Sequence, residues 1–108
     1  MEIKRMTYPH PEEHYNKSLF DVQTAGIAFQ MGTVFLKKGT RIPEQGFTRH
    51  QSHEISIIER GHIKMLSEDG SINGHLKSGD VVCLEAFEPQ AGHVLEDTKL
   101  IYILIRAQ

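Results

Sequence analysis

The 108-residue chain has a single cysteine, Cys83, and no tryptophan. One cysteine excludes an internal disulfide and any zinc site built from several thiolates, and it fits a reducing compartment. Long apolar segments are also missing: the first residues contain no signal-peptide core, and no run approaches the roughly 20 residues that span a bilayer. The sequence therefore predicts a cytoplasmic protein that makes no contact with a membrane.

The chain has no strong excess of charge of either sign. Twelve Lys and Arg residues stand against fourteen Asp and Glu, which gives a net charge of −2, and the basic residues are scattered along the sequence. A basic patch is the usual mark of a nucleic-acid partner, so no nucleic acid is expected. The hydrophobic content of 39% and the length are those of one soluble globular domain. What is plentiful is histidine, with seven copies.

Amphipathic helices are lacking, and short apolar segments instead alternate with Gly, Asp and Pro turn signals. The expected strands lie at 27–36, 55–58, 63–66, 72–76, 81–84 and 99–106. This spacing favours an antiparallel sandwich or barrel, because a parallel sheet would need room for crossover helices. Residues 1–18 contain two prolines and show no sustained period. They are expected to form an N-terminal arm, and residues 19–108 a single β-barrel domain.

The last expected strand is apolar on both sides, since residues 100–105 read Leu-Ile-Tyr-Ile-Leu-Ile. Such a strand is central in a sheet or covered by a partner chain. Left exposed, it would invite aggregation. The sequence therefore predicts self-association, most simply as a homodimer.

Two segments carry the residues that could bind a metal. His50 and Glu54 are four residues apart, so on a strand their side chains point to the same side, whereas His53 points away. His93 follows Gly92 later in the chain. Imidazole and carboxylate ligands suit divalent ions, and two His with one carboxylate leave positions open for a substrate. The predicted metal ligands are His50, Glu54 and His93.

In this register the sequence resembles a small single-domain cupin, whose first motif is written G-x5-H-x-H-x3-E-x6-G. Counting back from Gly61 places Glu54 at the motif glutamate and His50 at the second histidine. Residues 76–82 and Gly92-His93 resemble the start and the close of the second motif. The resemblance spans about residues 34 to 105. It implies an all-β fold, the antiparallel double-stranded β-helix or jelly-roll barrel, and a divalent metal ion such as Fe, Mn, Ni or Zn.

The first histidine of the motif is missing here. Counted forward from Gly39, its place falls on Gln45; counted back from Glu54, it falls on Thr48. The two counts disagree because the loop between them is lengthened. Either residue could supply a weak fourth oxygen ligand, so the expected site has two His and one Glu with Gln45 or Thr48 beside them.

Phe47, Met65 and Cys83 are expected to line the pocket, and the remaining histidines to lie on the surface. Three functions stay open on the sequence. The first is a metal-dependent pocket that acts on or binds a small organic molecule. The second is a metal-free binding or sensor module, and the third is a metal-free enzyme resembling the sugar-nucleotide epimerases. The pattern does not decide whether the protein is an enzyme.

Overall fold

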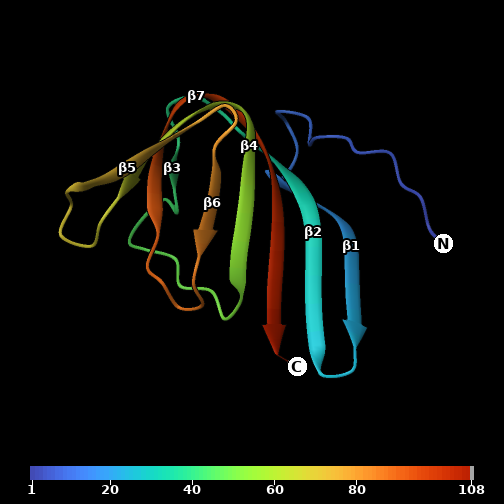
Figure 1. Ribbon diagram of the computed structural model, residues 1–108. Helices are drawn as coiled ribbons and strands as arrows, with labels where there is room; N and C mark the ends of the chain where they lie inside the picture. Colours follow the sequence, from blue (N-terminus) through green and yellow to red (C-terminus); the bar gives the residue numbers. More distant parts are fainter. Residues whose placement is uncertain (108) are drawn as a thin grey trace.

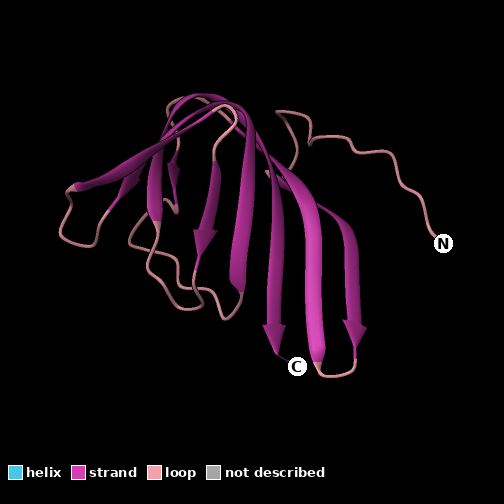
Figure 2. Cartoon of the chain, viewed as in Figure 1, coloured by secondary structure: helices cyan, strands magenta, loops and turns pink. Residues whose placement is uncertain are grey.

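A computed structural model describes residues 1–107, so Gln108, the end of the expected barrel domain, lies outside the described residues. The described chain is built from strands and loops (Figures 1 and 2). The strands are β1 (Asn16–Thr24), β2 (Ile27–Leu36), β3 (Arg41–Ile42), β4 (His53–Leu66), β5 (Ile72–Lys77), β6 (Val81–Leu84) and β7 (Ala91–Ala107). Within this part of the chain there is no helix of the length and apolar character that crosses a membrane. The all-β, antiparallel prediction is confirmed.

Two long strands, β4 and β7, hold the barrel together. They pair with each other along most of their length, with β2 on the other side of β7 and β5 and β6 on the other side of β4. The short β3 pairs with the first part of β7. In Figure 1 both long strands arch over the top of the molecule, so each takes part in both halves of the barrel. The final apolar strand is therefore central, as predicted.

The core lies between the two halves of the barrel. Alternate residues of the strands point inward, and the buried cluster consists of Val34, Leu36, Ile58, Ile63, Val94, Leu100 and Tyr102. Along β4 and β7, successive side chains therefore point alternately into this cluster and toward the opposite surface of the sheet. Ile58 is fully buried at the centre. The strands that carry the core also carry the site described below.

The expected N-terminal arm is docked over part of its length, and β1 begins inside it. The Thr33 hydroxyl donates to the Thr7 carbonyl at 2.6 Å. The Tyr8 hydroxyl pairs with the Glu59 carboxylate, and the Lys99 ammonium lies 5.3 Å from the centre of the Tyr8 ring. These contacts fix residues 7 and 8 across one end of the outer side of the sheet. In the segment before them, the Lys4 ammonium donates to the Leu19 carbonyl at 2.6 Å and lies 5.0 Å from the centre of the Phe20 ring.

Tyr102 ties β1 to the rest of the sheet. Its hydroxyl donates to the Asn16 side-chain oxygen at 2.7 Å and accepts from the Gln30 amide at 3.2 Å. Gly32 leaves the space for this ring, because a Cβ at that position would lie 2.6 Å from the Tyr102 hydroxyl oxygen. Burial also raises the pKa of Tyr102 above its ordinary value of 10.0.

Tyr102→Phe is expected to lower the free energy of unfolding by about 1–2 kcal/mol, because the hydrogen-bonding groups of Asn16 and Gln30 lose a partner. Urea unfolding at pH 7 measures the change, and Tyr15→Phe, at an exposed ring, is the matched control. The raised pKa means that the folded state favours the neutral phenol. The stabilisation that the neutral Tyr102 phenol gives the folded state is complete below pH 10 and is lost as pH rises through the folded-state pKa. The difference in free energy of unfolding between wild type and Tyr102→Phe should therefore narrow in that range. An equal loss in both variants would contradict this role.

Candidate functional site

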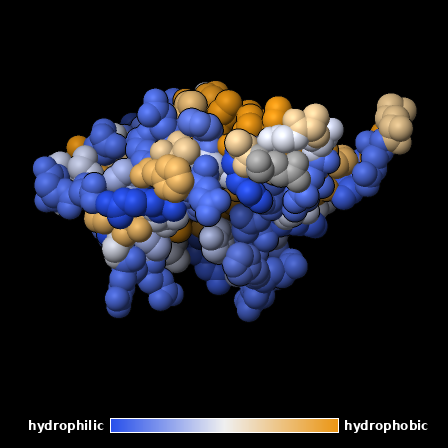
Figure 3. Space-filling model, turned by 90° about the horizontal axis from the view of Figure 1, so that it is seen from below, coloured by the Kyte–Doolittle hydropathy of each residue, from blue (hydrophilic) through white to orange (hydrophobic). Residues whose placement is uncertain are grey.

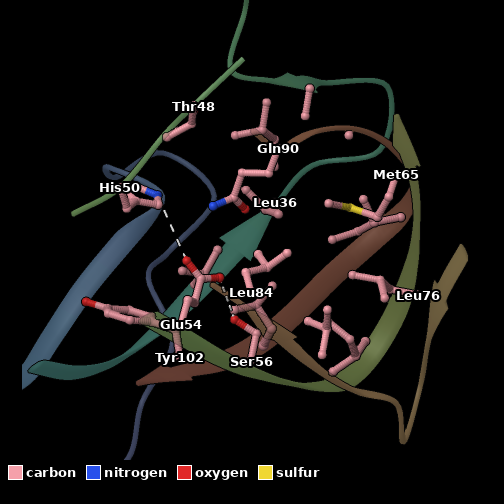
Figure 4. A pocket seen from close by; sticks show the side chains of 18 of the residues that line it. Leu36, Thr48, His50, Glu54, Ser56, Met65, Leu76, Leu84, Gln90 and Tyr102 are labelled. Atoms are coloured by element: carbon pink, nitrogen blue, oxygen red, sulfur yellow. Dashed lines mark hydrogen bonds and ion pairs between the residues drawn. The ribbon is translucent and has the colours of Figure 1, made fainter. Parts of the chain in front are cut away.

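A cavity of about 190 Å³ opens between the two halves of the barrel. Most of its wall is apolar, and Leu36, Met65, Leu76 and Leu84 are among the residues that form it. The polar side chains that line it are Thr48, His50, Glu54, Ser56 and Gln90, together with Asn16 and the two tyrosines Tyr15 and Tyr102. Figure 4 shows His50, Glu54 and Gln90 on one side of the cavity and Met65 and Leu76 on the other. The cavity therefore has a polar end and an apolar end.

Glu54 is the central polar group of the cavity. It lies on β4 two residues before Ser56, so both side chains point inward, and the Ser56 hydroxyl donates to one carboxylate oxygen at 2.8 Å. The other carboxylate oxygen lies 3.9 Å from Nε2 of His50. The Glu54 side chain is only 17% exposed. That second oxygen therefore faces the cavity with room for a further hydrogen-bond donor.

The loop before β4 brings His50 to the cavity. Thr48 and Gln90 exchange two backbone hydrogen bonds of 2.9 Å, and the carbonyl of His50 accepts from the Phe87 amide at 2.6 Å. These bonds join the loop to the segment that precedes β7. They also set the Gln90 side chain over the cavity, where Figure 4 shows its amide turned toward the same end as Glu54.

His93 lies on the other side of its strand. Gly92 takes the inward position, where a Cβ would meet a methyl carbon of Ile63 at 2.8 Å. Because sides alternate along a strand, the next residue points outward, and there His93 is paired with Arg41 and Lys64. The structure brings His50 and Glu54 together and leaves His93 outside the cavity.

Three of the other predicted site residues are also placed differently from the expectation. Gln45 is exposed in the loop after β3. Cys83 is exposed on β6, because its inward neighbours Val82 and Leu84 are the ones that line the cavity. Phe47 packs its ring against the guanidinium of Arg41, 5.6 Å from the ring centre. Met65 and Thr48 do line the cavity.

A divalent metal does not fit the donors that face the cavity. His50 and Glu54 supply two ligands, whereas a catalytic metal site takes three from the protein. Among residues 1–107, no group of three or more His, Cys, Asp or Glu side chains is placed to hold a metal ion. The arrangement can instead bind a molecule that carries a hydrogen-bond donor. The imidazole of His50 and the carboxylate of Glu54 are also groups that can exchange a proton with a bound molecule.

Sequence reasoning missed Ser56 and Gln90. Ser56 could have been found, because the alternation that points Glu54 inward also points Ser56 inward. Gln90 gave no signal of its own, since it lies in the lengthened loop before Gly92. It reaches the cavity through its backbone pairing with Thr48, which is distant in sequence.

Comparison with known proteins places the fold. No family model and no curated protein match the sequence. Among solved structures, a conserved protein of unknown function from Streptococcus pyogenes is similar with a TM-score of 0.64 at 16% identity, covering 97% of this chain and 99% of that one. An RmlC-like cupin with a double-stranded β-helix fold from Methanocaldococcus jannaschii gives 0.59 at 15% identity over 98% and 93%.

A third solved structure agrees with these two. A cupin-2 domain protein from Shewanella frigidimarina gives a TM-score of 0.60 at 14% identity over 85% of this chain and 81% of that one. Structural similarity at sequence identities this low is evidence for a shared fold and not for a shared activity. With the strand order and the cavity between the two halves of the barrel, they show that this chain has the fold of a small cupin domain, an antiparallel double-stranded β-helix.

Proposed function

We propose that this cupin domain binds a small, mainly apolar organic molecule through a hydrogen-bond donor on its head group, without a metal ion. The observation that carries the proposal is the Glu54 carboxylate in an otherwise largely apolar wall, with one oxygen bonded to Ser56 and the other open to the cavity. A protonated amine would be held most strongly, because hydrogen bonds between charged groups are about twice as strong as neutral ones.

The cavity volume limits the size of the ligand. A buried apolar cavity of about 150 Å³ is large enough for benzene. The cavity of about 190 Å³ therefore suits a single ring or a short branched chain with a small head group. The apolar body would lie against Met65 and Leu76, and the head group would lie between Glu54 and Gln90.

Three molecules of one shape test this proposal: benzylamine, benzyl alcohol and benzoate. Titration followed by amide chemical shifts in NMR should give affinities in the order amine, alcohol, carboxylate, with shifts concentrated at residues that line the cavity. The amine should bind at least tenfold more tightly than the carboxylate. Benzoate binding as tightly as benzylamine, or no binding of any of the three at millimolar concentration, would overturn the proposal.

Elemental analysis separates the proposal from the metal-dependent alternative. The protein should be purified without a chelator, and its metal content compared with that of His50→Ala. Metal content well below one ion per chain, unchanged by the substitution, supports metal-free binding. One equivalent of Fe, Mn, Ni or Zn that His50→Ala removes would overturn it in favour of a metal centre.

A further inference from the structure

The outer side of the half of the barrel that contains β3 and β5 carries a row of basic side chains. Residues directly opposite one another on antiparallel strands point to the same side. The pairing registers join four residues into one row across β3, β7, β4 and β5, which we call the basic row: Arg41, His93, Lys64 and His75. The row faces outward, because a sequence neighbour of each member lines the cavity: Ile42, Gly92, Ile63 and Leu76.

A second basic pair adjoins the basic row. His62 and Lys77 are opposed across β4 and β5, each two residues from a member of the row, and Nε2 of His62 lies 2.8 Å from Nδ1 of His75. We call the basic row and this pair together the basic face. An acidic residue, Glu96 on β7, is opposite His62 and borders the basic face. In Figure 1 the hairpin of β4 and β5 lies at the left, and the same end seen from below presents mainly hydrophilic side chains (Figure 3).

The basic face has no acidic partner in the described part of the chain. Among residues 1–107, the ion pairs join Lys4 to Glu2, Arg49 to Glu68 and His50 to Glu54, and none involves the basic face.

Arg41 is held in place by uncharged groups instead. Its guanidinium donates to the Pro43 carbonyl at 2.7 Å and lies 5.6 Å from the centre of the Phe47 ring. A guanidinium has five N–H donors, so the side chain is positioned while most of its donors remain available to an external carboxylate.

Gathering these residues in one place opposes the stability of the sheet. Like charges directly opposite one another on neighbouring strands are destabilising, and Lys64 has a histidine opposite it on both sides. The chain as a whole has a net charge of −2, so a general excess of basic residues does not account for the basic face. A local arrangement that lowers stability without a structural gain is typical of a functional surface.

The length of the basic row indicates the kind of anion that fits it. Three spacings of about 4.8 Å between strands make the row about 14 Å long, and about four residues of an extended peptide cover that length. One small anion would cover only part of it. A protein that binds a nucleic acid typically makes about 6–10 contacts to phosphates, whereas the basic face has three Lys and Arg residues.

We propose that the basic face binds an extended acidic segment of a partner protein. Carboxylates of the segment would lie over Arg41 and Lys64 and continue toward Lys77, and the segment would follow the basic row because Glu96 repels it beside His62. The basic face lies on the opposite side of the strands from the cavity, so this interaction is independent of the ligand proposed above.

A capped hexaglutamate peptide tests the proposal. Titrated at low salt and followed by amide chemical shifts in NMR, it should shift residues of β3, β5 and the first part of β7. Lys64→Glu, in the middle of the basic row, should weaken binding at least tenfold. The matched control is Lys17→Glu, an exposed residue of β1 that changes the net charge equally, and it should change the affinity by less than about twofold.

Two further measurements show that lost binding is not lost folding. Lys64→Glu places an acidic residue between two histidines, so its midpoint in urea unfolding should be no lower than that of the wild type. Its affinity for benzylamine should also be unchanged, because Lys64 points away from the cavity. If Lys64→Glu does not fold, His75→Glu at the exposed end of the basic row takes its place.

Three results would overturn the proposal. The first is no binding of hexaglutamate at millimolar concentration. The second is equal weakening by Lys64→Glu and Lys17→Glu, which would show an attraction to charge alone. The third is tighter binding of a six-nucleotide oligothymidylate than of hexaglutamate, which would assign the basic face to a nucleic acid.

Discussion

Glu54→Gln should weaken benzylamine binding about 10- to 100-fold and change benzyl alcohol binding by less than about fivefold. The substitution keeps the shape of the side chain and removes its charge, so only a charged head group loses a charge-assisted bond, worth about 1.5–3 kcal/mol. The geometry that supports this is the Glu54 oxygen that faces the cavity, 3.9 Å from Nε2 of His50. Isothermal titration calorimetry on both proteins measures the difference.

The matched control is Glu96→Gln, at an exposed position on β7 outside the cavity. It changes the net charge by the same amount and should leave all three affinities unaltered. Urea unfolding should show that Glu54→Gln is folded, since glutamine can still accept from the Ser56 hydroxyl. If benzylamine keeps its affinity in Glu54→Gln, the carboxylate does not hold the head group.

The fold was predictable because its signals are local. Short apolar segments between turn residues predicted the antiparallel class, the bounds of β2 and β6, and the central position of the last strand. β1 was missed because its inward side chains Asp21 and Gln23 face the polar mouth of the barrel, so the strand lacks the usual apolar alternation toward a core. It pairs with β2 as a hairpin around the two-residue turn Ala25-Gly26.

The site was only partly predictable because it depends on which side of a strand a residue faces. Shifting the register by one residue moves a side chain to the opposite side, and a lengthened loop precedes β7. The motif identified His93 by its place after Gly92 in the sequence. The close approach of Gly92 to Ile63 shows instead that Gly92 points inward and His93 outward. His50 and Glu54 lie together because a spacing of four is preserved across the start of β4.

The sequence predicts two separate strands, 55–58 and 63–66, on either side of Gly61, whereas β4 continues through this residue from His53 to Leu66. The register with β7 shifts three times around this residue, between Ile58 and Arg60, between Arg60 and His62, and between His62 and Ile63. Gly61 therefore marks a bulge that lets β4 bend from one half of the barrel into the other. Its φ of 119° is one that other residues rarely adopt.

Gly61→Ala should destabilise the fold by about 4 kcal/mol or more, enough to leave little folded protein at 37 °C. A Cβ at this position would lie 2.2 Å from the Thr98 hydroxyl oxygen and 2.6 Å from the Thr98 Cα, and Thr98 is fully buried. Gly79→Ala is the matched control: its φ is also positive, at 89°, but a Cβ would have nothing within 4 Å. It should lower the free energy of unfolding by only about 1–2 kcal/mol.

The double substitution Gly61→Ala with Thr98→Ala distinguishes two causes of the destabilisation: the contact with the Thr98 side chain and the contact with the Thr98 backbone. Removing the Thr98 hydroxyl relieves the contact at 2.2 Å, but the contact with the Thr98 backbone at 2.6 Å remains. Thr98→Ala also removes the acceptor of the His62 amide. Adding Thr98→Ala should therefore restore little stability to the Gly61→Ala protein. Urea unfolding of the wild type, the two single variants Gly61→Ala and Thr98→Ala, and the double variant measures this. Recovery to the level of Gly79→Ala would show that the side chain alone is responsible and that the two strands are free to move apart at the bulge.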